Sequence, residues 1–260
     1  MYNLEPFFDY VISEEIKYDL GLVREIPNLK LKINKYKDVW NKSERKSQKA
    51  IMKSFGSSFS RTDSQVFVIP YQLPANCQFD LKIYIPKLKE IVKDIDLMED
   101  DENIINKYLR DKDYIKNFSI KNIVQDDENK GEVNGLKMGI FKDFVKTILD
   151  YNIKEIDTNY AKTRLETNDP IICLDFTGLD NNSIPYFIVD GNHQAYAKVY
   201  LKNQQIIDTY MLSRNLWIKC LLTESDKTFI KIYNNLNYML GYMKGMGDLA
   251  NMNSNMYDLY

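Results

Sequence analysis

The 260-residue sequence predicts an α+β or α/β protein, with helices around a mixed sheet. Three patterns carry this expectation. Residues 186–190 are a continuous apolar run of strand type, and residues 81–85 alternate between apolar and polar side chains. Residues 229–240 instead repeat their apolar side chains with the period of a helix. The sequence is 44% hydrophobic, which is enough to build a sizeable core.

For residues 1–134 the sequence predicts a region of mixed helices and strands. A rough helical stripe covers 6–20, and short strands are expected at 66–69 and 81–85. Pro86 is a favourable residue for the first turn of a helix, so we expect a helix to begin there.

The polar stretch 125–135 has two glycines and lacks apolar periodicity, which is typical of a linker. We therefore place a domain boundary there, with a second domain over 135–260. A helix is expected directly after it, because Leu136, Ile140 and Phe144 recur in helical phase.

For the second domain the sequence predicts alternating strands and helices. Ser225 is expected to cap the final long helix, and the tail from Gly245 is expected to fray. The expected strands are 153–156, 170–175, 186–190, 206–210 and 216–222, with a helix over about 193–202.

Composition excludes several classes of protein. The net charge of −2 names no partner, and the three cysteines are far apart, so we expect neither a disulfide framework nor a Cys/His zinc site. No dedicated metal site is expected. Because no apolar run has the length of a membrane helix and the N-terminus does not resemble a signal peptide, we expect a cytoplasmic protein without a membrane partner.

The single histidine, His193, marks the candidate site. An apolar strand ends at Asp190 and Gly191, and a helix-type segment begins immediately afterwards. The free backbone N–H groups at such a helix start suit a phosphate, with Asn192 and His193 as side-chain donors. Asp190 would hold a hydroxyl, a metal-bound water or the turn itself. The alternative is a tight structural turn with a hydrogen-bonded histidine.

The segment 188–197, Ile-Val-Asp-Gly-Asn-His-Gln-Ala-Tyr-Ala, resembles the signature of the ParB/sulfiredoxin superfamily. The resemblance covers roughly residues 135–225. It implies a nucleotide at this turn, ATP or CTP with Mg²⁺, and phosphotransfer or nucleotide hydrolysis as reactions. The implied ligand contacts are Gly191, Asn192, His193, Gln194 and Arg164, and the implied catalytic residues are His193, Asp190 and Glu155, with Asp157 as an alternative to Glu155.

Two departures from the superfamily pattern limit what the resemblance implies. Asn192 stands where sulfiredoxins carry a reactive cysteine, so that activity is not expected. Gln194 replaces the usual arginine, which removes a bidentate partner for phosphate. Arg164 is the candidate replacement cation. The ParB Gly-Glu-Arg-Arg pattern is also absent, so a role in chromosome partitioning is not expected.

Two further functions remain open at this point. The lysine-rich segment 30–61 suits a nucleic-acid-binding protein or a ParB-like nuclease, with Trp40 or Phe59 stacking on bases. The simpler interpretation of this segment is a solvated surface. The third function is an inactive ParB-like interaction scaffold, which Gln194 favours. The leading interpretation is the binding of a nucleotide or another phosphorylated small molecule at residues 190–193.

Overall fold

The computed structural model describes residues 2–13, 16–17, 21–54, 65–96, 120–125, 133–152, 156–176 and 186–259. Over these residues the chain has an α+β fold, with one two-stranded and one five-stranded sheet. It divides into two compact units: residues 1–84 with 221–260, and residues 85–220. The division therefore falls at 84/85 and 220/221, whereas the polar stretch led us to expect 134/135.

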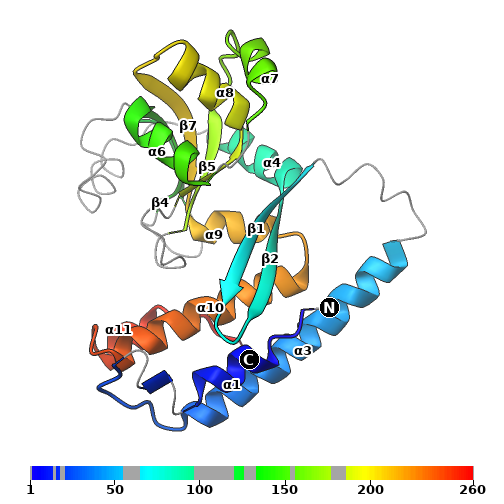
Figure 1. Cartoon of the computed structure of the whole chain (residues 1–260), viewed down its shortest axis with the longest axis vertical. Coiled ribbons are helices and arrows are strands. Elements are labelled where there is room, and N and C mark those ends of the chain that lie inside the picture. The colour runs from blue at the N-terminus through cyan, green and yellow to red at the C-terminus, as the bar shows by residue number, and fades with distance from the viewer. Residues whose placement is uncertain are drawn as a thin grey trace. The chain divides into compact units, whose positions relative to one another are not determined.

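The first unit combines both ends of the chain (Figure 1). A β-hairpin packs on helices through stacked and edge-on rings: Phe79 stacks on Phe229 at 4.0 Å, and Trp40 meets Phe79 edge-on at 5.5 Å. The elements of this unit are α1 (Glu5–Val11), α3 (Leu29–Ser54), β1 (Val66–Leu73), β2 (Cys77–Tyr84), α10 (Glu224–Met243) and α11 (Leu249–Ser254).

The long helix α3 turns one face to α10 and buries it. Ile33, Tyr36 and Trp40 recur at helical spacing on that face and are each at most 3% exposed. Farther along the same face, the buried Glu44 carboxylate accepts a hydrogen bond from Ser225 Oγ at 2.7 Å. The apolar periodicity therefore fixes which side of α3 meets solvent.

Helix α10 is capped two residues earlier in the chain than expected, at Thr223 instead of Ser225. Thr223 accepts a hydrogen bond from the Asp226 N–H, and the Asp226 carboxylate accepts one from the Thr223 N–H, which is a complete capping box. The expected cap, Ser225, lies inside the helix, where its N–H donates to Ser47 Oγ and its hydroxyl donates to Glu44.

The tail after Gly245 is ordered, which corrects the expectation that it frays. Two fully buried asparagines of α10 hold its main chain. Asn234 donates to the Asn255 carbonyl, while Asn235 donates to the Tyr257 carbonyl and accepts from the Tyr257 N–H. These side-chain amides supply hydrogen-bond partners that the main chain of an isolated tail would lack.

The second unit is built on the five-stranded sheet, with strand order β3-β4-β7-β5-β6. Neighbouring strands run antiparallel except β5 and β7, which are parallel. The strands are β3 (Ile120–Gln125), β4 (Val133–Phe141), β5 (Ile171–Asp175), β6 (Tyr186–Asp190) and β7 (Ile206–Leu212). The helices are α4 (Ile85–Asp96), α6 (Lys142–Asn152), α7 (Thr158–Thr163), α8 (Asn192–Tyr196), the π-helix η4 (Ala197–Leu201), α9 (Arg214–Trp217) and the 3₁₀ turn η5 (Ile218–Cys220).

The helix expected over residues 136–148 is wrong for the first part of this segment. That part is strand β4, which pairs with β7 from Gly135 to Phe141, and the helix α6 begins only at Lys142. Leu136 and Ile140 fit a helix period, whereas Leu136, Met138 and Ile140 fit a strand period, and pairing with β7 decides between them. The polar residues 126–132 lie outside the described residues and separate the antiparallel partners β3 and β4, so this stretch falls within one unit.

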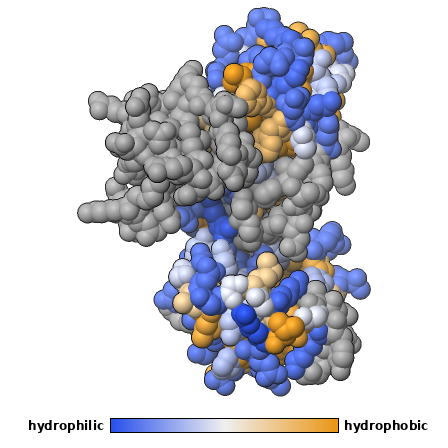
Figure 2. All heavy atoms as spheres, turned by 90° about the vertical axis from the view of Figure 1, so that its left-hand side faces the viewer, coloured by the Kyte–Doolittle hydropathy of each residue, from blue (hydrophilic) through white to orange (hydrophobic). Residues whose placement is uncertain are grey.

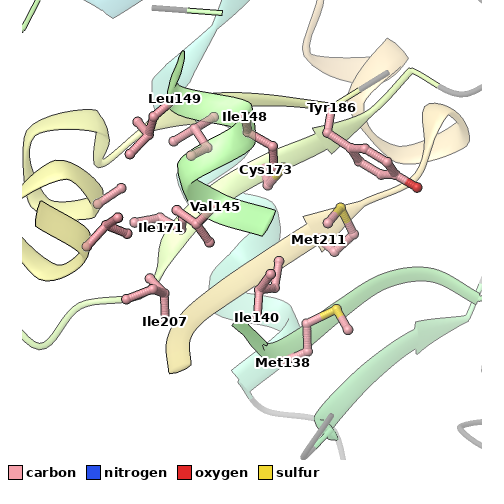
Figure 3. Packing of buried hydrophobic residues seen from close by; sticks show 13 residues of the cluster. Met138, Ile140, Val145, Ile148, Leu149, Ile171, Cys173, Tyr186, Ile207 and Met211 are labelled. Atoms are coloured by element: carbon pink, nitrogen blue, oxygen red, sulfur yellow. The ribbon is translucent and has the colours of Figure 1, made fainter. Parts of the chain in front are cut away.

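The core of the second unit lies where α6 crosses the sheet (Figure 3). Val145, Ile148 and Leu149 from α6 are at most 3% exposed and share one buried cluster with Cys173 and Ile171 of β5. Ile171 therefore belongs to the rigid core, and its position matters below because it also contacts the candidate site.

Residues 216–222 were expected to form a strand and instead form the short helical turns α9 and η5. Trp217 is completely buried, stacks on Phe176 at 4.2 Å and donates its indole N–H to the Asp175 carbonyl. Ring packing of this kind stabilises a helical turn as well as a strand, which is why the apolar run was assigned to the wrong element.

The surface of the described residues is mostly hydrophilic on the face drawn in Figure 2, where apolar side chains form small, separate areas. Within the described part of the chain, no helix combines the length and apolar character needed to cross a membrane.

Candidate functional site

The turn after β6 requires glycine. Gly191 has a φ of 85°, in the left-handed region that other residues rarely adopt. A Cβ built on Gly191 would lie 2.9 Å from Cγ2 of the core residue Ile171, which is closer than side chains allow. The chain can therefore pass from strand to helix here only because position 191 lacks a side chain.

One continuous helical run follows the turn. The α-helix α8 covers five residues and passes directly into the five-residue π-helix η4. Its first intrahelical bond runs from the Ala195 N–H to the Gly191 carbonyl. The preceding N–H groups, those of Asn192, His193 and Gln194, belong to the first turn and have no acceptor within the helix. They are the backbone donors that a phosphate would use.

A lysine from another helix lies at this turn. Lys89 of α4 places Nζ 3.0 Å from the Asp190 carboxylate, with side chains 53% and 37% exposed respectively. Its half-exposed amine can turn from the carboxylate toward an incoming anion. Lys89 was not anticipated from sequence, because 101 positions separate it from Asp190 and its local pattern is that of an ordinary amphipathic helix.

Asn192 is only partly buried, but its side-chain oxygen is fully buried and lacks a hydrogen-bond partner. A buried polar atom left unsatisfied is uncommon and costs stability. A side-chain amide presents either an acceptor or two donors, depending on its rotation, so Asn192 can respond to a ligand of either kind.

The imidazole of His193 is held edge-on against Tyr160 of α7, with ring centroids 4.8 Å apart and an interplanar angle of 82°. Asp157 caps α7 by accepting from the N–H groups of Asn159 and Tyr160. The cap fixes the helix start, the helix presents Tyr160, and Tyr160 orients His193. Tyr160 was not anticipated from sequence.

Gln194 is only 3% exposed and donates its amide to the Asp169 carbonyl. It therefore ties the start of β5 to the helix instead of facing solvent as a ligand contact would. Asp157 is occupied as a cap, which argues against its use as a base, and Glu155 lies outside the described residues. Arg164 ends α7, and its N–H donates to the Ala161 carbonyl. The described contacts do not bring the Arg164 guanidinium to Asp190.

A second cation, which is buried, lies on the helical run that follows the turn. Lys198 of η4 is 3% exposed, and burial lowers its pKa from the ordinary value of 10.5, while Asp208 and Asp169 act in the opposite direction. π-Helical turns often occur near functional sites. Burial disfavours the charged form of this lysine, and the two carboxylates favour it.

Thiol and metal chemistry have little support from the described residues. Burial raises the pKa of Cys173 strongly and that of Cys220 to about 11, so both thiols are poor nucleophiles at neutral pH. In the described part of the chain, no group of three or more His, Cys, Asp or Glu side chains converges on one point. A divalent cation at the turn would therefore have to arrive with a ligand that supplies oxygen atoms of its own.

Comparisons of this chain with protein-family models, with curated proteins and with solved structures find no match. Function is therefore inferred from the residues of the site.

Proposed function

We propose that the turn at residues 190–193 binds the phosphate of a nucleotide or of another phosphorylated small molecule. The observation that carries this proposal is the Lys89–Asp190 ion pair at the start of a helical run that Gly191 opens. It brings a side-chain cation to three backbone N–H groups that have no acceptor within the helix.

The local electrostatics support an anion. The N-terminal end of a helix carries partial positive charge, and anions there are stabilised by about 0.3–1 kcal/mol at exposed positions. Lys89 adds a full positive charge. It replaces the charge that is lost because position 194 is glutamine instead of arginine. Asp190 lowers this attraction, and it also keeps the lysine amine at the turn when no ligand is bound.

The side chains around the phosphate position suit the rest of a nucleotide. His193 is partly exposed and can donate to a phosphate oxygen, while Tyr160 is 50% exposed and presents a ring beside it. The Asn192 oxygen is buried and unpartnered, and it would accept from a ribose hydroxyl or a base amine once the side chain rotates toward the ligand. Phosphorylated small molecules with hydroxyl groups share this chemistry, and nucleotides combine all of it.

Any reaction at this site would use the same residues. His193 is the candidate to give or take a proton at a phosphate oxygen, and Asp190 to hold a hydroxyl or a water bound to Mg²⁺. Mg²⁺ would come with the nucleotide, because it is usually held by one or two carboxylates together with substrate phosphates. Both phosphotransfer and hydrolysis require that the nucleotide binds, so binding is tested first.

Calorimetric titration with ATP, CTP and GTP in the presence of Mg²⁺ tests the proposal. We expect one nucleotide to bind, and His193→Ala to weaken it by about 1.5–3 kcal/mol, the usual contribution of a hydrogen bond to a charged group. A companion variant, Tyr160→Ala, removes the same ring contact while keeping the imidazole donor. We expect a smaller loss in this variant.

Two results would refute this function. The absence of binding to all three nucleotides and to inorganic phosphate would leave the interaction scaffold as the better interpretation. Tight binding that is unchanged by His193→Ala would place the ligand at another part of the chain.

A further inference from the structure

Over residues 29–50, where side-chain exposure is described, helix α3 carries most of its charged side chains on the side opposite its buried apolar ones. Its 26 residues include nine Lys or Arg and two Asp or Glu, a formal charge of +7. Since the whole chain carries −2, all other residues together carry −9. Positive charge is therefore concentrated in one element of a protein that is otherwise acidic.

The basic stripe of α3 consists of the exposed residues Lys35, Lys42, Arg45, Lys46 and Lys49. Lys35, Lys42 and Lys49 are spaced by seven residues, which brings successive side chains to nearly the same side of a helix. At 1.5 Å per residue the stripe extends for about 21 Å. It lies on the side of α3 away from the buried residues Ile33, Tyr36 and Trp40.

The acidic residues of α3 do not cancel this charge. Glu44 is 6% exposed and is bound to Ser225 on the buried side of the helix, which leaves Asp38 as the acidic residue on the exposed side. On the flank of the helix, Lys37 pairs with Asp9 at 2.6 Å and lies outside the stripe.

We infer that the basic stripe of α3 binds the phosphate backbone of duplex nucleic acid, independently of the turn at 190–193. A straight row of cations about 21 Å long matches a duplex, which carries a negative charge every ~1.7 Å along its axis. Sequence-independent binding is expected, because phosphate contacts position a protein without reading bases.

The buried rings decide between modes of binding. Trp40 was expected to stack on bases, but it is 2% exposed and packs on Phe79, so it is unavailable. Phe59 lies outside the described residues. The described part of α3 therefore does not offer Trp40 for stacking on the bases of a single strand. An anionic membrane is disfavoured, because interfacial helices bury an apolar face in lipid and α3 has already buried its own in the protein.

Fluorescence anisotropy of the full chain with a 20-base-pair duplex tests the inference. We expect binding whose logarithmic affinity falls with logarithmic salt by about 0.9 for each neutralised phosphate, or about 3.6 for four phosphates. Reversing Lys42, Arg45, Lys46 and Lys49 to Glu should abolish it. His193→Ala should leave it unchanged, which separates this surface from the nucleotide site.

The matched control reverses four exposed lysines outside α3, namely Lys87, Lys93, Lys146 and Lys219, and so makes the same change in net charge. Circular dichroism verifies that both variants are folded. Equal loss of binding in the two variants would overturn the inference, because total charge would then govern binding. It would also be overturned by a wild type that binds no duplex at low salt, or that binds anionic vesicles in preference to duplex.

Discussion

The amine of Lys89 in helix α4 lies 3.0 Å from the carboxylate of Asp190 at the end of strand β6. This pair joins two segments of the second unit that are far apart in sequence, at the point where a glycine turn begins a helix. A cation, a carboxylate and the backbone N–H groups of the first helical turn are thereby brought together.

Replacing Lys89 tests the cation at the turn. Lys89→Met should weaken nucleotide binding by about 1.5–3 kcal/mol, because it removes a charged hydrogen-bond donor and leaves Asp190 to repel the phosphate. Lys93→Met is the control, since Lys93 is an exposed lysine on the same helix. Titration calorimetry measures both. Equal affinities in the two variants would exclude Lys89 from the site.

Neutralising Asp190 should have the opposite effect when Mg²⁺ is absent. Asp190→Asn removes a negative charge from the turn and releases Lys89 from its ion pair. We expect nucleotide affinity without Mg²⁺ to rise by about 1 kcal/mol, the interaction energy of two unit charges ~4 Å apart in water. If affinity falls instead, Asp190 contributes to binding directly rather than by holding Lys89.

The glycine of the turn should be required for stability. Gly191→Ala forces alanine into a left-handed conformation, at a cost of about 1–2 kcal/mol, and pushes its Cβ against Ile171. Gly241→Ala in α10 is the control, because it meets no atom within 4 Å and gains helix propensity. Thermal unfolding should show a lower Tm for the first variant and an unchanged or higher Tm for the second. A change in nucleotide binding by Gly191→Ala would therefore not by itself identify a ligand contact.

Burial of Lys198 predicts a pH-dependent gain in stability on its replacement. Because its folded pKa lies below 10.5, the folded state releases this proton before the unfolded state does, and stability rises with pH between the two values. Below both values the full cost of burying the charge remains. Lys198→Met should thus raise the Tm at pH 7, and the gain should shrink as the pH approaches 10. A gain that is independent of pH would assign the effect to packing alone.

The sequence was informative wherever local pattern decides structure. The strand at 186–190, the glycine turn and the helix after it were confirmed. The strand expected at 170–175 is found at Ile171–Asp175, and the helix expected from Pro86 begins at Ile85. These elements combine a clear apolar period with turn or capping residues, so neighbouring residues are sufficient to specify them.

The remaining errors have tertiary causes. Residues 133–141 form a strand because β7 pairs with them, and the tail after Gly245 is ordered because Asn234 and Asn235 hold it. At the candidate site the turn itself was predicted, but Lys89 and Tyr160 come from other helices. Gln194 was expected at the ligand and instead binds the Asp169 carbonyl. Such partners depend on how helices pack, which local sequence does not encode.

The most direct test of the nucleotide site is the change in backbone amide chemical shifts when nucleotide and Mg²⁺ are added to ¹⁵N-labelled protein. A phosphate at the turn would accept hydrogen bonds from the N–H groups of Asn192, His193 and Gln194, so these amides should move most and saturate together. Inorganic phosphate should move the same amides at higher concentration. Shifts concentrated at other residues, or no shifts at millimolar nucleotide, would contradict phosphate binding at residues 190–193.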